Sequence, residues 1–191
     1  KEKMATTIQR RTLERINFIG RVLVITVTRS ASVISRWIRT VHYFNLSSRH
    51  PLVVGVGVQW TPFRYYRDPL PDVPTLCVGN RCLIIQLKHC NRTFLADRGI
   101  TFLGIWNSQD KGKLERCSHR VEIWRLLDVR LYLSARLRNC SFEKIVNEYL
   151  EKKISTSDWG VRILSNNQIF QASEDSYVSF KLGVKQRLWE V

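Results

Sequence analysis

The chain has 191 residues, a length that suits one compact domain. With 44% hydrophobic and 25% charged residues and only 9 Gly and 5 Pro, the composition excludes a disordered or fibrous protein. Lys and Arg total 31 against 16 Asp and Glu, so the net charge of +15 attracts polyanions. Nucleic acid is the first partner to consider and an anionic membrane surface the second, beside the plainer alternative of a basic face that serves solubility.

The first 60 residues predict a hairpin, a helix and a buried strand. Residues 16–28 are rich in β-branched residues around a Gly-Arg break, which is typical of two short strands. Ser30 or Ser32 then precedes apolar residues at helical spacing as far as Val41, which predicts a capped helix. Residues 50–60 are a continuous apolar run, typical of a central strand covered on both faces.

The rest of the chain alternates between strand and helix patterns. Two apolar runs meet at Gly79-Asn80, which predicts a second hairpin, and residues 100–107 predict a further buried strand. Residues 121–137 begin as a strand and pass into a helix near Leu131. Other helices are expected at 91–97, 108–117, 141–150 and 167–191. This order predicts one α/β domain with a mixed sheet, in which residues 1–49 add a hairpin and a helix to a main body of residues 50–191.

Several classes of protein are excluded by what the sequence lacks. No apolar run approaches the roughly 20 residues of a membrane span, and the first residues lack the apolar segment of a signal peptide, so an intracellular location is expected, with nucleus and cytoplasm equally open. The cysteines form no C-x-x-C pair and the histidines no zinc-finger spacing, which argues against a structural zinc site. Most of the cysteines are expected to pack as small apolar groups. The five cysteines are Cys77, Cys82, Cys90, Cys117 and Cys140.

Three segments occur in an order that resembles a known enzyme superfamily. They are VVGVGVQW at 53–60, GIWNSQDKGKL at 104–114, and the combination of SDW, LSNNQI and A-x-x-D between 157 and 175. Together they resemble the DEDD (DnaQ-like) superfamily of 3′-5′ exonucleases, in particular the Werner syndrome exonuclease. The amino-terminal hairpin and helix further resemble those of the plant RISC-interacting clearing exoribonucleases.

The resemblance implies a ribonuclease H-like fold and a site for two Mg²⁺ or Mn²⁺ ions. Its second and last motifs place Asp110 and Asp175 as catalytic carboxylates and metal ligands. At the first motif, where the family has an Asp and a Glu, this chain has Gly57 and Gln59, and Gln171 stands where the family has a Tyr. Mg²⁺ selects charged oxygen ligands, so these changes predict a degenerate site that cleaves weakly or not at all.

Two function hypotheses remain open on the sequence. One is a module that binds single-stranded RNA or DNA without cutting it, with Trp60 and Lys113 as candidate nucleic-acid contacts. The other is an active metal-dependent exonuclease that uses the remaining Asp110 and Asp175. The resemblance to the plant enzymes also implies a homo-oligomer, a hexamer. Each site residue also has a plainer alternative. Asp110 would be an acid at a helix terminus and Asp175 a surface acid, while Trp60 would be a core aromatic and Lys113 a solvated lysine.

Overall fold

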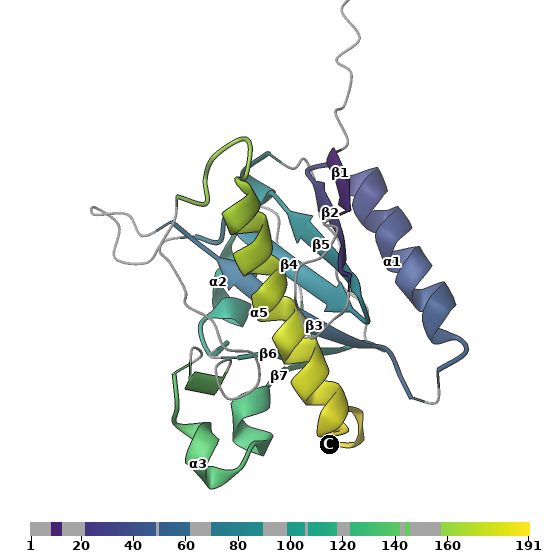
Figure 1. Ribbon diagram of the computed structural model, residues 1–191, viewed down its shortest axis with the longest axis vertical. Helices are drawn as coiled ribbons and strands as arrows, with labels where there is room; N and C mark the ends of the chain where they lie inside the picture. The colour runs from purple at the N-terminus through teal and green to yellow at the C-terminus, as the bar shows by residue number, and fades with distance from the viewer. Residues whose placement is uncertain are drawn as a thin grey trace, which may run out of the picture.

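A computed structural model describes most of the chain as one mixed sheet with helices on both faces (Figure 1). The described residues are 9–12, 22–48, 50–61, 70–89, 99–105, 107–117, 123–141, 144–145 and 158–191. None of the helices in these ranges is long and apolar enough to cross a membrane.

The sheet has seven strands among the described residues, in the order β1-β2-β5-β4-β3-β6-β7. β1 pairs antiparallel with β2, and β4 pairs antiparallel with β3 and β5. The parallel pairs are β2 with β5, β3 with β6 and β6 with β7. The bounds are Gln9–Thr12 for β1, Val24–Thr28 for β2, Val53–Gln59 for β3, Val73–Val78 for β4, Arg81–Ile85 for β5, Thr101–Gly104 for β6 and Leu126–Asp128 for β7.

Two long helices cover the sheet from opposite sides. Helix α5 crosses in front of β3 and β4, and α1 stands beside β1 and β2 (Figure 1). The α-helices are α1 at Ala31–Asn45, α2 at Asp110–Arg116, α3 at Ala135–Arg138 and α5 at Asn166–Lys185. Short 3-10 helices lie at Leu87–His89 (η1), Val129–Tyr132 (η2) and Leu188–Glu190 (η3).

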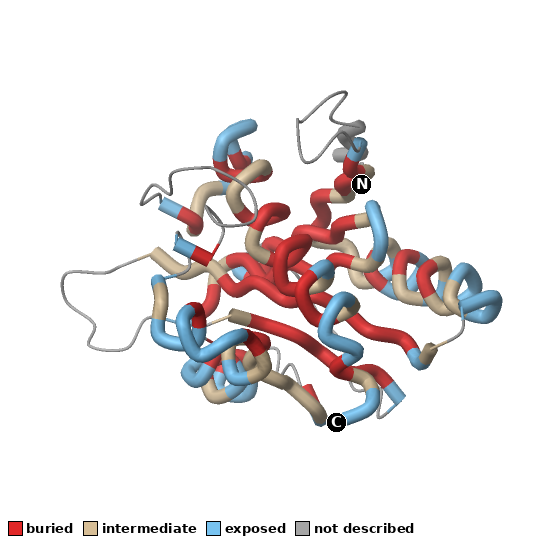
Figure 2. Tube along the Cα trace, turned by 60° about the horizontal axis from the view of Figure 1, so that its bottom comes forward, coloured by how far each residue is buried: buried red, intermediate tan, exposed pale blue. Residues whose placement is uncertain are grey.

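The alternation of side chains along each strand divides the core in two. On β3, Val53 joins the cluster that contains Ala172 and Val178 of α5. Its neighbour Val54 joins the second cluster, which contains Trp37 of α1 and Leu114 of α2. The buried strands form the centre of the molecule, and the exposed residues lie on the helices and turns (Figure 2). This two-sided burial explains why the β3 sequence is continuously apolar.

Most of the elements predicted from the sequence are present. The helix after Ser30, the buried strand within 50–60, the hairpin at Gly79-Asn80 and the strand within 100–107 are confirmed. Gly79 has a φ of +62°, the turn conformation that favours glycine. The stretch from 121 is a strand at Leu126–Asp128, as predicted, although it continues as a 3-10 turn.

Three boundaries were predicted wrongly. β2 is the second strand of the N-terminal hairpin, but its partner is β1 at Gln9–Thr12, before the predicted range of 16–28. β1 reads Gln-Arg-Arg-Thr, a polar pattern that suits the edge of a sheet and gives no apolar strand signal. The last helix ends at Lys185, because Arg187 adopts a left-handed conformation (φ 53°) that stops it. The N-cap of α2 is Gln109 where Ser108 was expected.

Two other predictions cannot be compared in full. The helix expected at 91–97 lies outside the described residues, as do most residues of the helix expected at 141–150. At the start of the latter, the backbone N–H of Lys144 donates to the Ser141 hydroxyl at 3.2 Å, and the N–H of Ile145 donates to the Ser141 carbonyl. Ser141 therefore caps the first turn, as its sequence position indicates.

Candidate functional site

Strand β3 turns Gly55, Gly57 and Gln59 toward helix α5. A Cβ atom at Gly57 would lie 2.9 Å from the Asp175 Cβ, and one at Gly55 would lie 1.9 Å from the Ser176 carbonyl oxygen. Contacts this short are not tolerated between carbon atoms or with backbone, so any side chain at either position must displace the helix. The two glycines therefore let the backbone of α5 lie directly on the backbone of β3.

Helix α5 is fixed at its start by a reciprocal cap. The backbone N–H of Gln168 donates to the Ser165 hydroxyl, and the backbone N–H of Ser165 donates to Gln168 Oε1 at 2.9 Å. Ser and Gln three residues apart, just before an apolar pattern, are the sequence signature of this capping box. The cap sets where the helix begins, and so which of its residues face β3. Asp175 lies in the middle of the helix, opposite Gln59.

The carboxylate of Asp175 is held by a neutral amide. Gln59 Nε2 donates a hydrogen bond to Asp175 Oδ2, so the amide nitrogen occupies one side of the carboxylate. The pKa of Asp175 is raised to about 8, chiefly by burial and also by the nearby Glu174 and Asp110, whereas the Gln59 hydrogen bond lowers it. Asp175 is half-buried and makes a specific contact with Gln59, so the alternative of a plain surface acid is wrong.

Asp110 is the first residue of helix α2. It is 6% exposed, and burial raises its pKa to about 7. Lys113 lowers this pKa by its positive charge, and Asp128 raises it. Because Asp110 and Asp175 each respond to nearby carboxylates, and Asp175 to Asp110 itself, the structure brings the two predicted acids into one electrostatic group.

The two predicted nucleic-acid contacts pack against each other. The Lys113 ammonium lies 4.9 Å from the centre of the Trp60 ring, a cation-π contact. Lys113 is only 2% exposed, so it is a buried cation beside Asp110, and the alternative of a solvated lysine is wrong. Trp159, the other aromatic residue of these motifs, is buried in the core beside α5.

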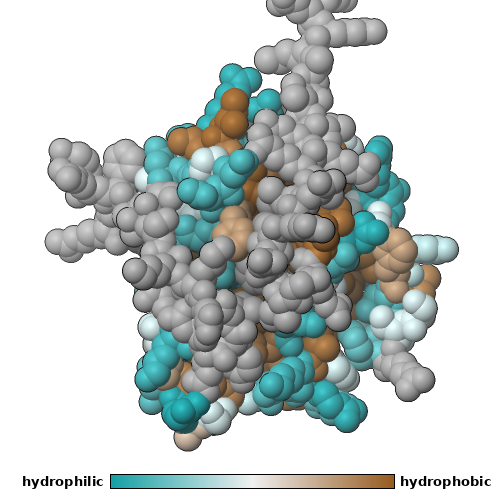
Figure 3. Space-filling view, viewed as in Figure 1, coloured by the Kyte–Doolittle hydropathy of each residue, from teal (hydrophilic) through white to brown (hydrophobic). Residues whose placement is uncertain are grey.

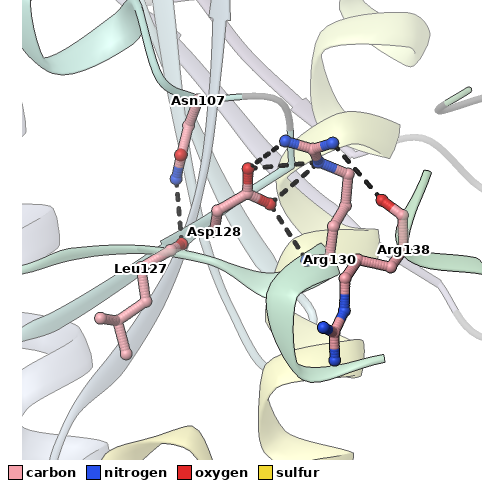
Figure 4. Close-up of polar contacts among 5 residues, drawn as sticks. All are labelled: Asn107, Leu127, Asp128, Arg130 and Arg138. Carbon is pink, nitrogen blue, oxygen red and sulfur yellow. Dashed lines mark hydrogen bonds and ion pairs between the residues drawn. The ribbon is translucent and has the colours of Figure 1, made fainter. Parts of the chain in front are cut away.

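The carboxylate of Asp128 is held by Arg130, two residues further along the chain. Arg130 donates from Nε at 3.1 Å and from Nη2 at 2.5 Å to the Asp128 carboxylate, and its backbone N–H donates at 3.0 Å (Figure 4). The same guanidinium donates to the Arg138 carbonyl oxygen at the end of α3. Through these contacts Asp128 caps the 3-10 helix η2. Asn107 is fixed nearby through a 2.9 Å bond from its Nδ2 to the Leu127 carbonyl oxygen.

Sequence reasoning missed one acid of the site. Glu174 is 4% exposed and contributes to the raised pKa of Asp175. The signal was available, since Glu174 and Asp175 are adjacent in an otherwise apolar and small-residue stretch of α5, but the motif directed attention to Asp175 alone. Gln171 lies one turn before Asp175 on the same helix and is half-buried.

The residues present do not fit a site for two metal ions. Within the described ranges, no group of three or more His, Cys, Asp and Glu side chains is placed to hold a metal. Gln59 turns an N–H donor toward Asp175, where a cation would require an oxygen atom. Gly57 supplies no ligand at all. Without the bridging carboxylate of the first motif, Asp110 and Asp175 lack the charge that a pair of divalent ions needs.

Known structures share this fold at low sequence identity. RNase D of Escherichia coli, an exoribonuclease involved in structured RNA processing, has 16% identity and a TM-score of 0.67, with 85% of this chain and 44% of RNase D covered. The Nibbler EXO domain of Aedes aegypti has 14% identity and a TM-score of 0.66, with 94% and 92% covered. NrnC of Brucella melitensis with bound Mg²⁺ has 20% identity and a TM-score of 0.57, with 75% and 76% covered. A further structure of NrnC is bound to pGG.

These likenesses define the class of fold. It is an α/β fold with a mixed sheet that these exonuclease structures share, and it agrees with the ribonuclease H-like fold predicted from the sequence. This chain spans less than half the length of RNase D and nearly the whole Nibbler EXO domain. No protein-family model matches the chain, and no curated protein matches it significantly.

Proposed function

We propose that this chain binds single-stranded RNA or DNA on an exonuclease fold and cleaves it weakly or not at all. The observation that carries the proposal is the close packing of α5 on β3. There the Gln59 amide holds the Asp175 carboxylate, and Gly57 lets the helix occupy the space that a third acid would need.

The support for nucleic acid is electrostatic and comparative. A net charge of +15 attracts a polyanion whether or not a hydrolytic site is complete. The structural neighbours include an exoribonuclease and a protein bound to pGG. Neither argument depends on Asp110 or Asp175, so we expect binding to persist when these residues are replaced.

The second candidate is an active exonuclease that uses Asp110 and Asp175 with Mg²⁺ or Mn²⁺. The charge of Asp110 contributes to the raised pKa of Asp175, and this supports the second candidate because both acids would be its metal ligands. NrnC, which shares the fold, has been seen with Mg²⁺.

One experiment separates the two candidates. The purified chain is incubated with a 5′-labelled single strand in Mg²⁺ or Mn²⁺, and both cleavage and binding are measured. We expect binding without a ladder of shortened products. The Gly57→Asp/Gln59→Glu variant is expected to gain detectable cleavage and to melt at a lower temperature, since the new side chain at 57 must displace α5. Robust cleavage by the unmodified chain that disappears in Asp175→Ala and in Asp110→Ala would overturn the proposal.

We also propose a homo-oligomer, a hexamer, on the resemblance to the plant exoribonucleases. Light scattering coupled to gel filtration tests it directly. A mass near 22.5 kDa at micromolar concentration would contradict it.

A further inference from the structure

The outward face of helix α1 combines arginine with exposed aromatic rings. Its apolar residues Ile34, Trp37 and Val41 are buried against the sheet. On the opposite side Arg36 and Arg39 are exposed, and the helix ends with two aromatic residues in solvent. Tyr43 is 71% and Phe44 is 52% exposed, and their rings meet edge to face at 5.8 Å.

This face lies in a part of the chain that has no acidic residue. Between Glu14 and Asp68 the sequence contains eight arginines and no Asp or Glu. Three of these arginines, Arg29, Arg36 and Arg39, belong to the described residues at and on α1. An exposed apolar face that docked a typical protein partner would not require such one-sided charge. A polyanion would be attracted to it.

A cavity opens at the end of this face. It has a volume of about 370 Å³ and lies where the end of α1 meets the β4–β5 turn and helix α5. This volume is within the range of small-ligand pockets. Its lining combines rings with hydrogen-bonding groups: Phe44, Asn45, His50, Asn80, Arg81 and Phe180. In the space-filling view, hydrophilic and hydrophobic residues lie side by side along the edge of the molecule where α1 stands (Figure 3).

The polar and aromatic groups of the cavity are already positioned by contacts of their own. The Arg81 guanidinium lies 4.7 Å from the centre of the Phe44 ring, and His50 stacks on Trp189 at 4.4 Å with an interplanar angle of 18°. Asn45 donates from Nδ2 to the His50 carbonyl oxygen at 3.3 Å. Rings held in place by such contacts lose little freedom when a flat ligand stacks on them.

We propose that this surface, the α1 surface, is a second nucleic-acid site in which Arg36 and Arg39 contact phosphates and a base stacks at Tyr43, Phe44 and the adjoining cavity. Stacked bases on aromatic rings beside a positively charged track are the general chemistry of single-strand binding. The cavity of this surface includes Val53 at the start of β3, about 20 Å along the strand from Gln59, since a strand rises about 3.3 Å per residue. It therefore does not use the pocket of Asp110 and Asp175. The inference rests on the proposed function, because it assumes that the chain binds nucleic acid.

The test compares two double variants of the α1 surface with a matched control. Arg36→Ala/Arg39→Ala removes two exposed charges, and Tyr43→Ala/Phe44→Ala removes the exposed rings. Lys181→Ala/Lys185→Ala removes two exposed charges from α5 as the control. Binding is measured by fluorescence anisotropy with labelled 20-nucleotide poly-uridine and poly-thymidine strands over a range of salt concentrations, and thermal melting verifies that each variant is folded.

We expect each α1 variant to raise Kd about tenfold and the lysine control to change Kd less than threefold. The arginine variant is also expected to reduce the slope of log K against log salt by about 1.4, because each single-strand phosphate contact contributes about 0.7. The aromatic variant should leave that slope nearly unchanged.

The outcomes separate this inference from the proposed function. If the unmodified chain binds neither strand, the proposed function fails and the inference fails with it. If it binds and both α1 variants bind equally well, the inference is overturned and the proposed function stands; the exposed rings of α1 would then be left as a surface for a protein partner. A photo-crosslink from 4-thiouridine to Tyr43 or Phe44 would support the inference, and crosslinks confined to Trp60 would contradict it.

Discussion

Gln59 donates its amide N–H to Asp175, and this contact places an acid of raised pKa between a strand and a helix. The Asp175 pKa of about 8 lies above the ordinary value near 3.9, so the folded chain keeps a proton that the unfolded chain releases. Between these two values the folded state binds more protons than the unfolded state. The contribution of Asp175 to stability is therefore fully present below pH 4 and is lost as the pH rises toward 8.

The Asp175→Asn variant removes this pH dependence at one site. Asn keeps an oxygen that accepts the Gln59 hydrogen bond but carries no charge to desolvate. We expect the variant to be more stable than the unmodified chain by about 1–3 kcal/mol at pH 8.5 and about equally stable at pH 4. Thermal melting across this range measures the difference. Glu115→Gln, at an exposed position, is the control and should show no such trend; a stability gain at pH 8.5 in the control as well would contradict the explanation.

Gly57 is the residue whose replacement most directly tests the contact of β3 with α5. Gly57→Ala places a Cβ 2.9 Å from that of Asp175, so the helix must move or the strand must bend. We expect a loss of about 1–3 kcal/mol in the free energy of unfolding, measured by urea denaturation. Gly112→Ala is the matched control on α2, where the added methyl meets only the flexible end of Arg116. Because alanine favours helix, that variant is expected to be neutral or slightly stabilising.

At the scale of elements, the hairpin of β4 and β5 carries two thiols on its inner face. Cys77 and Cys82 are directly opposite in the register, both fully buried, and their Sγ atoms lie 2.6 Å apart. Burial raises the pKa of the Cys77 thiol, and the neighbouring Cys82 raises it further. The sequence identified these residues as small apolar packing groups, which their burial confirms, but it did not show that they face each other.

This pairing makes the hairpin oxidisable. Two thiols and one molecule of hydrogen peroxide give a disulfide and two molecules of water, and we expect this bond to form within the chain. The reaction should be slow at pH 7, since the raised pKa keeps Cys77 protonated, and faster at pH 9. Mass spectrometry of the peptides measures the loss of two hydrogens. Cys77→Ser should abolish it, whereas an unchanged loss in that variant would show that other cysteines pair.

Elements with a strong local signal were predictable from the sequence, and those set by distant contacts were not. The β4–β5 hairpin follows from Gly79, and the start of α5 follows from Ser165 and Gln168. The first strand at Gln9–Thr12 is polar and forms a strand because it pairs with β2. No local sequence pattern specifies this pairing. The end of α5 depends on the left-handed backbone conformation of Arg187. Arginine rarely adopts this conformation, so the sequence does not predict it.

The candidate site was predictable in the same uneven way. Motif spacing singled out Asp110 and Asp175, and the charge of Asp110 does affect the pKa of Asp175. It could not show that Gln59 would turn its N–H toward Asp175, or that Lys113 would be buried beneath Trp60. These facts depend on how closely the helix and strand approach, which is a property of packing between segments more than a hundred residues apart.

At the scale of the whole molecule, the two-sided core leaves the basic residues on helices and turns around the sheet. Electrostatic binding by such a surface weakens as salt rises. Binding releases counterions from the phosphates, and this release is less favourable when the same ions are already abundant in solution. For about five phosphate contacts to a single strand, we expect Kd to rise about a hundredfold between 50 and 200 mM salt. Anisotropy measurements at several salt concentrations check this, and an affinity independent of salt would contradict a backbone-dominated interface.

The close approach of α5 to the two glycines of β3 also bears on how the chain can change over generations. A single mutation that introduced a carboxylate at position 57 would have to push a helix away from the sheet, so it would lower stability before any catalytic advantage appeared. Changes in α5 that made room would in turn leave a void beneath a glycine. Each of these two changes is therefore harmful unless the other has already happened, so selection acts more freely on the outer surface than on the contact of β3 with α5.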